Sequence, residues 1–209
     1  MSKKNGLLGK KIGMTRIFSE EGAATAVTVI ETGPCVVLQK KTAEKEGYNA
    51  IQLGFVGKKA SRANKPQAGH CQAAGKGVFY HIKEFRVDDP SRYEVGQEIR
   101  VADVFQVGDL VDITGTTKGR GFQGVVRRHS FNRGPMSHGS MHYRAPGSIG
   151  SSAWPSRVIK GRRMPGQMGN VAVTKKNVMV LDILPEDNAL VVKGSVPGAG
   201  NGILRIHVK

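Results

Sequence analysis

Three glycines near the middle of the sequence have the spacing of a phosphate-binding loop. Gly119, Gly121 and Gly124 in KGRGFQGVV satisfy G-x-G-x-x-G, and with Val126 the stretch also satisfies the glycine-loop pattern of protein kinases. Both patterns work because residues without a side chain let backbone N–H groups come close to a phosphate. The residues therefore indicate phosphate binding. The surrounding sequence indicates whether the phosphate belongs to a nucleotide or to another ligand.

The surroundings argue against a bound nucleotide. A dinucleotide site needs an acidic residue about 20 positions after the glycines to bind a ribose hydroxyl, but the first acid after Gly124 is Asp182. No V-A-I-K, H-R-D or D-F-G sequence follows, and GHCQAAGKG at 69–77 has one residue too many for a Walker loop. We therefore expect no nucleotide cofactor and no small-molecule substrate.

Histidine and cysteine lack the spacing of a metal site. His70, Cys71 and His81 match no zinc pattern. His138 and His142 stand four positions apart in HGSMH, which lacks the glutamate of a metalloprotease helix. Serine is frequent around them, but no nearby acid could orient a catalytic base. We expect no metal, no cofactor and no enzymatic activity, and we interpret these histidines as hydrogen-bonding or stacking groups.

The charge of the chain points to a polyanionic partner. The 32 Lys and Arg outnumber the 16 Asp and Glu, which gives a formal net charge of +16 and a pI near 10.2. That pI exceeds the value of about 9 that marks many nucleic-acid-binding domains. Residues 113–181 contain twelve of the bases and no acid. Bases that recur every few residues suit a phosphate backbone better than a single ligand.

The candidate RNA-binding residues are the bases of the long loop within this stretch, with the histidines and the tryptophan between them. They are Lys118, Arg120, Arg127, Arg128, Arg133, His138, His142, Arg144, Trp154, Arg157, Lys160, Arg162 and Arg163. Aromatic side chains between cations can stack on unpaired bases, which favours structured RNA over duplex DNA. We expect Trp154 to make such a contact, whereas Phe122 and Phe131 are expected to form a small local core.

Short strands are expected on both sides of the loop. β-branched or alternating runs predict strands at 24–31, 34–41, 50–56, 80–87, 107–115, 177–184, 189–196 and 202–209. The runs at 177–184 and 189–196 are expected to form a hairpin. One helix is expected over 65–75, with Asn64 as its cap and Pro66 in its first turn. Many short strands with few helices predict a mainly β fold, either a barrel or a sandwich.

The strand pattern stops between about 116 and 169. Such a stretch buries too little apolar surface to offset an ordering entropy of about 1–2 kcal/mol per residue, so it is expected to fold against a partner. The predicted organisation is a discontinuous β domain formed by 1–115 and 170–209, with 116–169 inserted as a basic RNA-binding extension. Lysines within 2–5 and 9–11 add a smaller basic patch.

The two cysteines and the hydropathy pattern bear on location. Cys35 and Cys71 form no C-x-x-C motif and no disulfide framework, which fits a reducing compartment. The sequence shows no signal-peptide pattern and no apolar run long enough to cross a membrane. We expect a cytoplasmic protein without a membrane partner.

The run FQVGDLVDITGTTKGRGFQGVVRR at 105–128 closely resembles the signature of the ribosomal protein L-three family. Further motifs similar to that family occur in order along the whole chain, namely GLLGKKIGMTRIF, NKPQAGH, RAPGSIG, KGRRMPGQMGN and ALVVKGSVPGAGNG. The resemblance implies a translation-protein-type β-barrel with a long, irregular internal extension. It also implies binding to large-subunit (23S) rRNA near its 3′ end, a role in nucleating subunit assembly, and contacts with neighbouring ribosomal proteins.

The resemblance further implies that the tip of the extension, residues 150–154, braces RNA near the peptidyl transferase centre without doing chemistry. It thereby adds Ser151 and Ser152 to the candidate RNA contacts. Many bacterial members have a glutamine just after GSIG, which is methylated in some. This chain has Ser151, Ser152 and Ala153 there, so that modification is not expected. Two other classes remain open from the residues alone: an architectural DNA-binding protein and a nucleotide-dependent enzyme.

Overall fold

A computed structural model describes residues 5–209 of the chain. Residues 2–4 of the basic patch expected near the N-terminus lie outside the described residues. The chain forms two compact units. Met1–Thr117 together with Ala172–Lys209 form one, here named the barrel unit, and Lys118–Val171 form the other, here named the extension unit.

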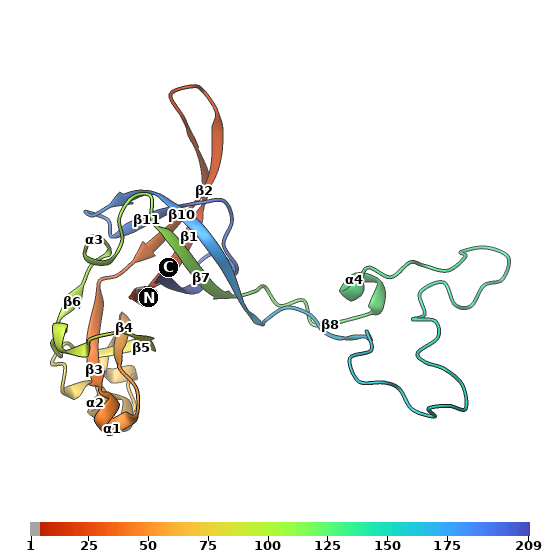
Figure 1. Cartoon of the computed structure of the whole chain (residues 1–209), viewed down its shortest axis with the longest axis horizontal. Coiled ribbons are helices and arrows are strands. Elements are labelled where there is room, and N and C mark those ends of the chain that lie inside the picture. Colours follow the sequence, from red (N-terminus) through yellow and green to blue (C-terminus); the bar gives the residue numbers. More distant parts are fainter. Residues whose placement is uncertain (1–4) are drawn as a thin grey trace. The chain divides into compact units, whose positions relative to one another are not determined.

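Six antiparallel strands close into a barrel in the barrel unit (Figure 1). Their order is β1 (Gly6–Phe18), β12 (Ile203–Val208), β7 (Leu110–Thr116), β10 (Ala172–Leu184), β11 (Ala189–Lys193) and β2 (Ala24–Thr32), and β2 pairs again with β1. Inward side chains such as Leu7, Ile30 and Ile113 are fully buried. The predicted mainly β fold class is confirmed, and so is the β10–β11 hairpin, in which Leu184 pairs with Ala189.

A second sheet of four antiparallel strands shares the core of the barrel. Its order is β5 (Val78–Arg86), β4 (Ala50–Lys58), β3 (Cys35–Lys41) and β6 (Glu98–Ile99). Phe85 and Leu53 of this sheet belong to the same hydrophobic cluster as Leu7 and Ile206 of the barrel. Because one cluster spans both sheets, the barrel and the second sheet stabilise each other as a single core.

The helices of the barrel unit are short. They are α1 (Ala43–Glu46), α2 (Lys65–Gln72) and α3 (Val101–Val104), with single 3-10 turns η1 (Ala60–Arg62) and η2 (Pro90–Arg92). Helix α2 begins where the sequence predicts, with Pro66 in its first turn, but the Asn64 side chain makes no capping hydrogen bond. Among residues 5–209, no helix has the length and apolar character needed to cross a membrane.

Strand β1 was not among the predicted strands. Its glycines and adjacent lysines interrupt the alternation that signals a strand. The fold nevertheless requires the first of these glycines. A Cβ on Gly6 would lie 2.1 Å from the carbonyl oxygen of Ile206 and 3.0 Å from the Phe85 ring. Glycine here permits close contact between β1, β12 and the second sheet.

Both cysteines are free and buried in the barrel unit. Cys35 lies on β3, where its thiol is 3.6 Å from the carbonyl oxygen of Leu8. Burial raises the pKa of the Cys35 thiol to about 12. Since the thiolate is the reactive form of cysteine, Cys35 acts as an apolar core residue.

Candidate nucleic-acid interface

The extension unit begins and ends as a narrow two-stranded ribbon. Strand β8 (Phe122–Gln123) pairs antiparallel with β9 (Gly166–Gln167). Next to this pair, the N–H of Arg120 donates to the carbonyl of Met168 at 2.9 Å, and the N–H of Met168 donates to the carbonyl of Gly121 at 2.9 Å. Gly119 and Gly121 therefore lie beside the paired residues of a ribbon, and only Gly124 stands between a strand and a helix.

Helix α4 (Val125–His129) follows the ribbon and holds the returning chain. The Arg128 guanidinium donates to the carbonyl of Met164 at 2.7 Å, and Nε2 of His129 lies 3.0 Å from the same oxygen. Within residues 118–171, Val125 is the one buried residue. Sequence reasoning missed the positioning role of Arg128 and His129, because Met164 is 36 and 35 positions away and no local pattern connects them.

Residues 130–165 form irregular loops with short internal bonds (Figure 1). The N–H of Gly134 donates to the carbonyl of Tyr143 at 3.0 Å and closes one loop. The Arg162 guanidinium donates to the carbonyl of Ser148 and closes a second loop, which carries the predicted tip. A hollow of about 280 Å³ lies inside this second loop, lined by Ser148, Ile149, Gly150, Ser151, Pro155, Arg157, Ile159 and Arg162.

The three glycines at which the backbone is expected to approach a phosphate differ in whether the fold itself requires glycine there. Gly121 has a φ of +67°, in the left-handed region that favours glycine. A Cβ on Gly124 would meet no atom within 4 Å, and one on Gly119 would meet only Asn170, at 3.6 Å. At Gly119 and Gly124 the missing side chain therefore relieves no internal clash, and it leaves the backbone open to an approaching group.

The other predicted RNA-binding side chains lie almost entirely on the surface. Arg128 is half-buried, and the exposed ones are Lys118, Arg120, Arg127, Arg133, His138, His142, Arg144, Ser151, Ser152, Trp154, Arg157, Lys160, Arg162 and Arg163. Trp154 is 86% exposed. Neither His138 nor His142 belongs to a candidate metal site, since residues 5–209 contain no group of three His, Cys, Asp or Glu placed to hold a metal ion.

One sequence-based expectation about the aromatic residues is wrong. Phe122 does not form a local core, because its side chain is 74% exposed. It lies on the two-residue strand β8, and Val125 at the start of α4 takes the buried position instead. Phe131 is half-buried, with its ring centroid 6.0 Å from that of His129.

The cations of the extension unit have no acidic neighbours in the sequence. Residues 118–171 contain ten Lys and Arg and no Asp or Glu. The ion pairs among residues 5–209 are Lys10–Glu31, Lys41–Glu84, Lys76–Glu98 and Arg92–Asp89. All four lie in the barrel unit. A surface with ten cations and no internal counter-charge creates a strongly positive potential, which attracts polyanions.

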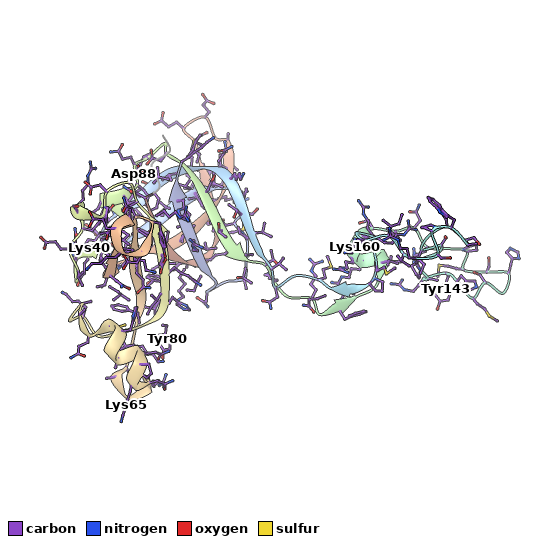
Figure 2. All side chains as sticks on the ribbon, turned by 60° about the horizontal axis from the view of Figure 1, so that its bottom comes forward. Lys40, Lys65, Tyr80, Asp88, Tyr143 and Lys160 are labelled. Atoms are coloured by element: carbon purple, nitrogen blue, oxygen red, sulfur yellow. The ribbon has the colours of Figure 1, made fainter. Side chains whose placement is uncertain are left out.

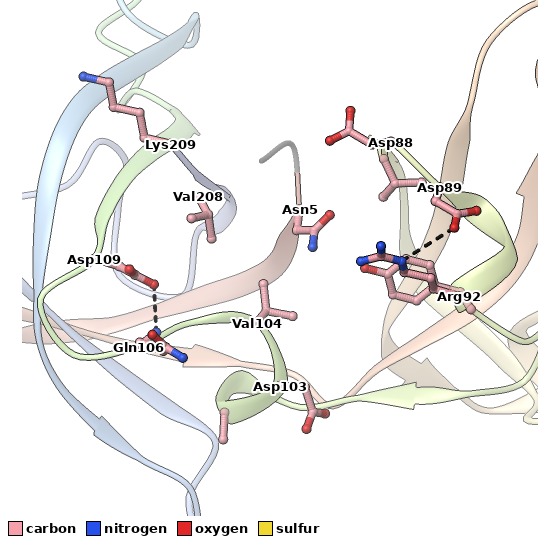
Figure 3. A pocket seen from close by; sticks show the side chains of 13 residues that line it. Asn5, Asp88, Asp89, Arg92, Asp103, Val104, Gln106, Asp109, Val208 and Lys209 are labelled. Atoms are coloured by element: carbon pink, nitrogen blue, oxygen red, sulfur yellow. Dashed lines mark hydrogen bonds and ion pairs between the residues drawn. The ribbon is translucent and has the colours of Figure 1, made fainter. Parts of the chain in front are cut away.

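One hollow of the barrel unit is lined by more acidic than basic side chains. It measures about 760 Å³ (Figure 3), and its acidic lining residues are Asp88, Asp89, Asp103 and Asp109. These carboxylates serve local structure: Asp103 accepts from the N–H of Arg100 at 2.8 Å, and Asp109 accepts from the N–H of Gln106 at 2.8 Å. Arg92 and Lys209 also line the hollow, but the four carboxylates outnumber these two cations. Because a surplus of carboxylates repels phosphate, we exclude this hollow from the interface.

A mainly β barrel with a long, acid-free insertion defines a class of strongly basic proteins whose surface potential attracts polyanions. The sequence model of the family described as Ribosomal protein L3 matches residues 86–190. The chain belongs to the ribosomal protein L3 family, as its full-length similarity to curated members also shows.

Three relatives illustrate this similarity, and each carries the name large ribosomal subunit protein uL3. The protein of Desulfotalea psychrophila is 55% identical over 209 residues, which cover 100% of both chains. That of Geobacter metallireducens is 55% identical over 201 residues, 96% of this chain and 95% of the relative. That of Syntrophus aciditrophicus is 56% identical over 203 residues, 97% of this chain and 93% of the relative.

Proposed function

We propose that this protein is a structural constituent of the large ribosomal subunit and that it binds 23S rRNA directly. The observation that carries the proposal is the extension unit, whose ten bases have no acid among them and almost all lie on the surface. The relatives are named as proteins of the large ribosomal subunit, which supports the same conclusion. The protein would act in cytoplasmic ribosomes, beside neighbouring ribosomal proteins and without catalysis.

The extension binds RNA chiefly through the phosphate backbone. Arginine offers two parallel donors to one phosphate, and the open backbone at Gly119 and Gly124 lets N–H groups approach a phosphate closely. Each neutralised phosphate releases counterions. If about ten phosphates are neutralised, log affinity falls with log salt at a slope of about −7 to −9.

The finer part of the proposal concerns place and assembly. The extension over 116–169 carries RNA binding, and the domain of 1–115 with 170–209 faces neighbouring proteins. The tip at 150–154 contacts RNA near the peptidyl transferase centre, where the exposed Trp154 ring can stack on an unpaired base. Binding near the 3′ end of 23S rRNA nucleates assembly of the subunit.

Salt-dependent binding separates this function from its rivals. The full chain is titrated with a structured fragment of 23S rRNA, with duplex DNA of equal length, and with ATP. We expect the rRNA fragment to bind most tightly and with the steep salt slope given above. Tighter binding to duplex DNA would favour an architectural DNA-binding protein, and saturable ATP binding with turnover would favour an enzyme. Crosslinks from residues 118–163 to RNA would then identify the nucleotides.

A further inference from the structure

Two long stretches of the sequence contain several bases and no acid. Residues 47–83 contain six Lys and Arg and no Asp or Glu, which makes them a second acid-free stretch beside the extension unit. Together the two stretches hold 16 bases, which equals the net charge of +16. In the rest of the chain, acids and bases balance. The sequence of the barrel unit therefore contains a basic region over 47–83 in addition to the lysines near the N-terminus.

Four of the six bases lie within eight positions of the chain. They are Lys58 at the end of β4, Lys59, Arg62 in η1 and Lys65 at the start of α2. We name these residues, together with Tyr80 on β5, the Tyr80 patch. In Figure 2, Lys65 and Tyr80 lie toward one end of the barrel unit, and Asp88 of the acidic hollow lies toward the other.

Specific contacts hold part of the patch around the tyrosine. Nη1 of Arg62 lies 3.4 Å from the hydroxyl oxygen of Tyr80. Nζ of Lys58 lies 5.6 Å from the centroid of the Tyr80 ring and donates to the side chain of Gln67 at 2.9 Å. Two cations from different elements thus meet at one ring that is 46% exposed.

The patch cations have no carboxylate partner within the described part of the chain. The four ion pairs among residues 5–209 include Lys76 of the same stretch, with Glu98 at 3.1 Å, but no residue of the Tyr80 patch. Lys59, Arg62 and Lys65 are exposed. Like charges gathered without a counter-charge repel one another, and an external polyanion would offset that repulsion.

We infer that the Tyr80 patch is a second RNA contact, separate from the extension unit, which binds a phosphate backbone through its cations and a base through Tyr80. The inference rests on the proposed function in that RNA is taken as the partner. RNA suits the patch better than an acidic peptide, because an exposed aromatic ring flanked by cations offers both stacking and phosphate contacts.

The test compares three variants of the full chain that each lose three positive charges. The patch variant is Lys58→Gln, Arg62→Gln, Lys65→Gln. The extension variant is Arg133→Gln, Arg144→Gln, Arg157→Gln. The control removes exposed cations elsewhere in the barrel unit, as Lys40→Gln, Lys45→Gln, Lys193→Gln. For each, the affinity for a 23S rRNA fragment is measured over a range of salt concentrations, and thermal unfolding is recorded.

We expect the patch variant to reduce the steepness of the salt slope by about 2–3, as three lost phosphate contacts require. The control should keep the wild-type slope, and all three variants should unfold as the wild type does. Tyr80→Ala should weaken RNA binding about fivefold or more, while Tyr80→Phe retains it.

The outcomes separate this inference from the proposed function. A patch variant that binds like the control, beside a weakened extension variant, would overturn the inference alone. If neither variant weakened RNA binding, the proposed function itself would fail. A poly-glutamate peptide is titrated in parallel as a model of an acidic protein. If the patch variant bound rRNA like the wild type but lost affinity for this peptide, the patch would be a protein contact and the inference would be wrong.

Discussion

Different interactions stabilise the barrel unit and the extension unit. The barrel unit buries a continuous cluster of apolar side chains from both of its sheets, and four ion pairs join acids to bases within its described residues. The extension unit buries one residue, Val125, and is closed by hydrogen bonds to backbone carbonyls such as that of Met164. A core that buries enough apolar surface folds alone, whereas a chain that exposes its charges depends on a partner.

The comparison also shows where each unit places its aromatic rings. Phe85 of the barrel unit is fully buried, while Phe122 and Trp154 of the extension unit are mostly exposed. Large exposed rings cost hydration free energy in isolation. The buried Phe85 ring therefore serves stability, whereas the exposed Phe122 and Trp154 rings are available for binding.

The largest expected effect separates these two uses of phenylalanine. Phe85→Ala should lower the free energy of unfolding by about 3–5 kcal/mol, because it removes a buried ring and leaves a cavity. Phe122→Ala should change it by less than about 0.5 kcal/mol, because that ring is already exposed. Urea unfolding of the full chain measures both values. Equal losses in the two variants would break the distinction between the units.

Removal of positive charge should affect rRNA binding more in the extension unit than in the barrel unit. Replacement of Arg133, Arg144, Arg157 and Arg163 by glutamine should reduce the steepness of the salt slope for rRNA binding by about 3–4. Stability should not change, since these side chains are exposed. The matched control replaces Lys40, Lys45, Lys176 and Lys193, which are exposed in the barrel unit. An equal loss of slope in the control would mean that net charge, and not its location, drives binding.

A single substitution at the tip also separates RNA binding from stability. Trp154→Ala should weaken rRNA binding by about 1–3 kcal/mol, the usual contribution of one stacked base. Trp154→Phe should retain most of the affinity, and neither change should affect urea unfolding. Filter binding at constant salt measures the affinities. Unchanged affinity for Trp154→Ala would remove the stacking role of this residue.

The smallest expected effect concerns pH and the barrel unit. Bonds from Lys41, at 2.6 Å, and from Tyr48, at 2.8 Å, lower the pKa of Glu84 below its usual range. The ionised carboxylate therefore favours the folded state at neutral pH, and this contribution is lost as the pH falls through the lowered pKa. The stability difference between wild type and Glu84→Gln should shrink as the pH falls below the usual pKa range of glutamate. The exposed Glu44→Gln control should show no such trend.

Much of the barrel could be predicted from the sequence because its strands carry local signals. Alternating or β-branched runs identified β2, β5 and β11 without knowledge of their partners. Strand β1 was not predicted, because its glycines interrupt the strand pattern. One of them, Gly6, is needed for a close approach to Ile206, which lies 200 positions along the chain. A local pattern cannot report a contact with a distant element.

The candidate site shows the same limit. The bases of the extension could be found by charge alone, but the bonds from Arg128 and His129 to Met164 required the folded chain. The Tyr80 patch had a sequence signal, the acid-free run 47–83. That signal is diluted when charge is averaged over the whole region outside the extension unit, where 22 Lys and Arg accompany 16 Asp and Glu.

The pairing of β1 with β12 has a consequence for the order of events during synthesis. Leu7 pairs with Ile206, so the barrel cannot close until the last strand has been translated. The extension lies between β7 and β10 and therefore leaves the translating ribosome earlier than β12 does. A nascent chain thus exposes its cationic loops while β1 still lacks one of its neighbours, so the RNA binding proposed for these loops can precede completion of the fold.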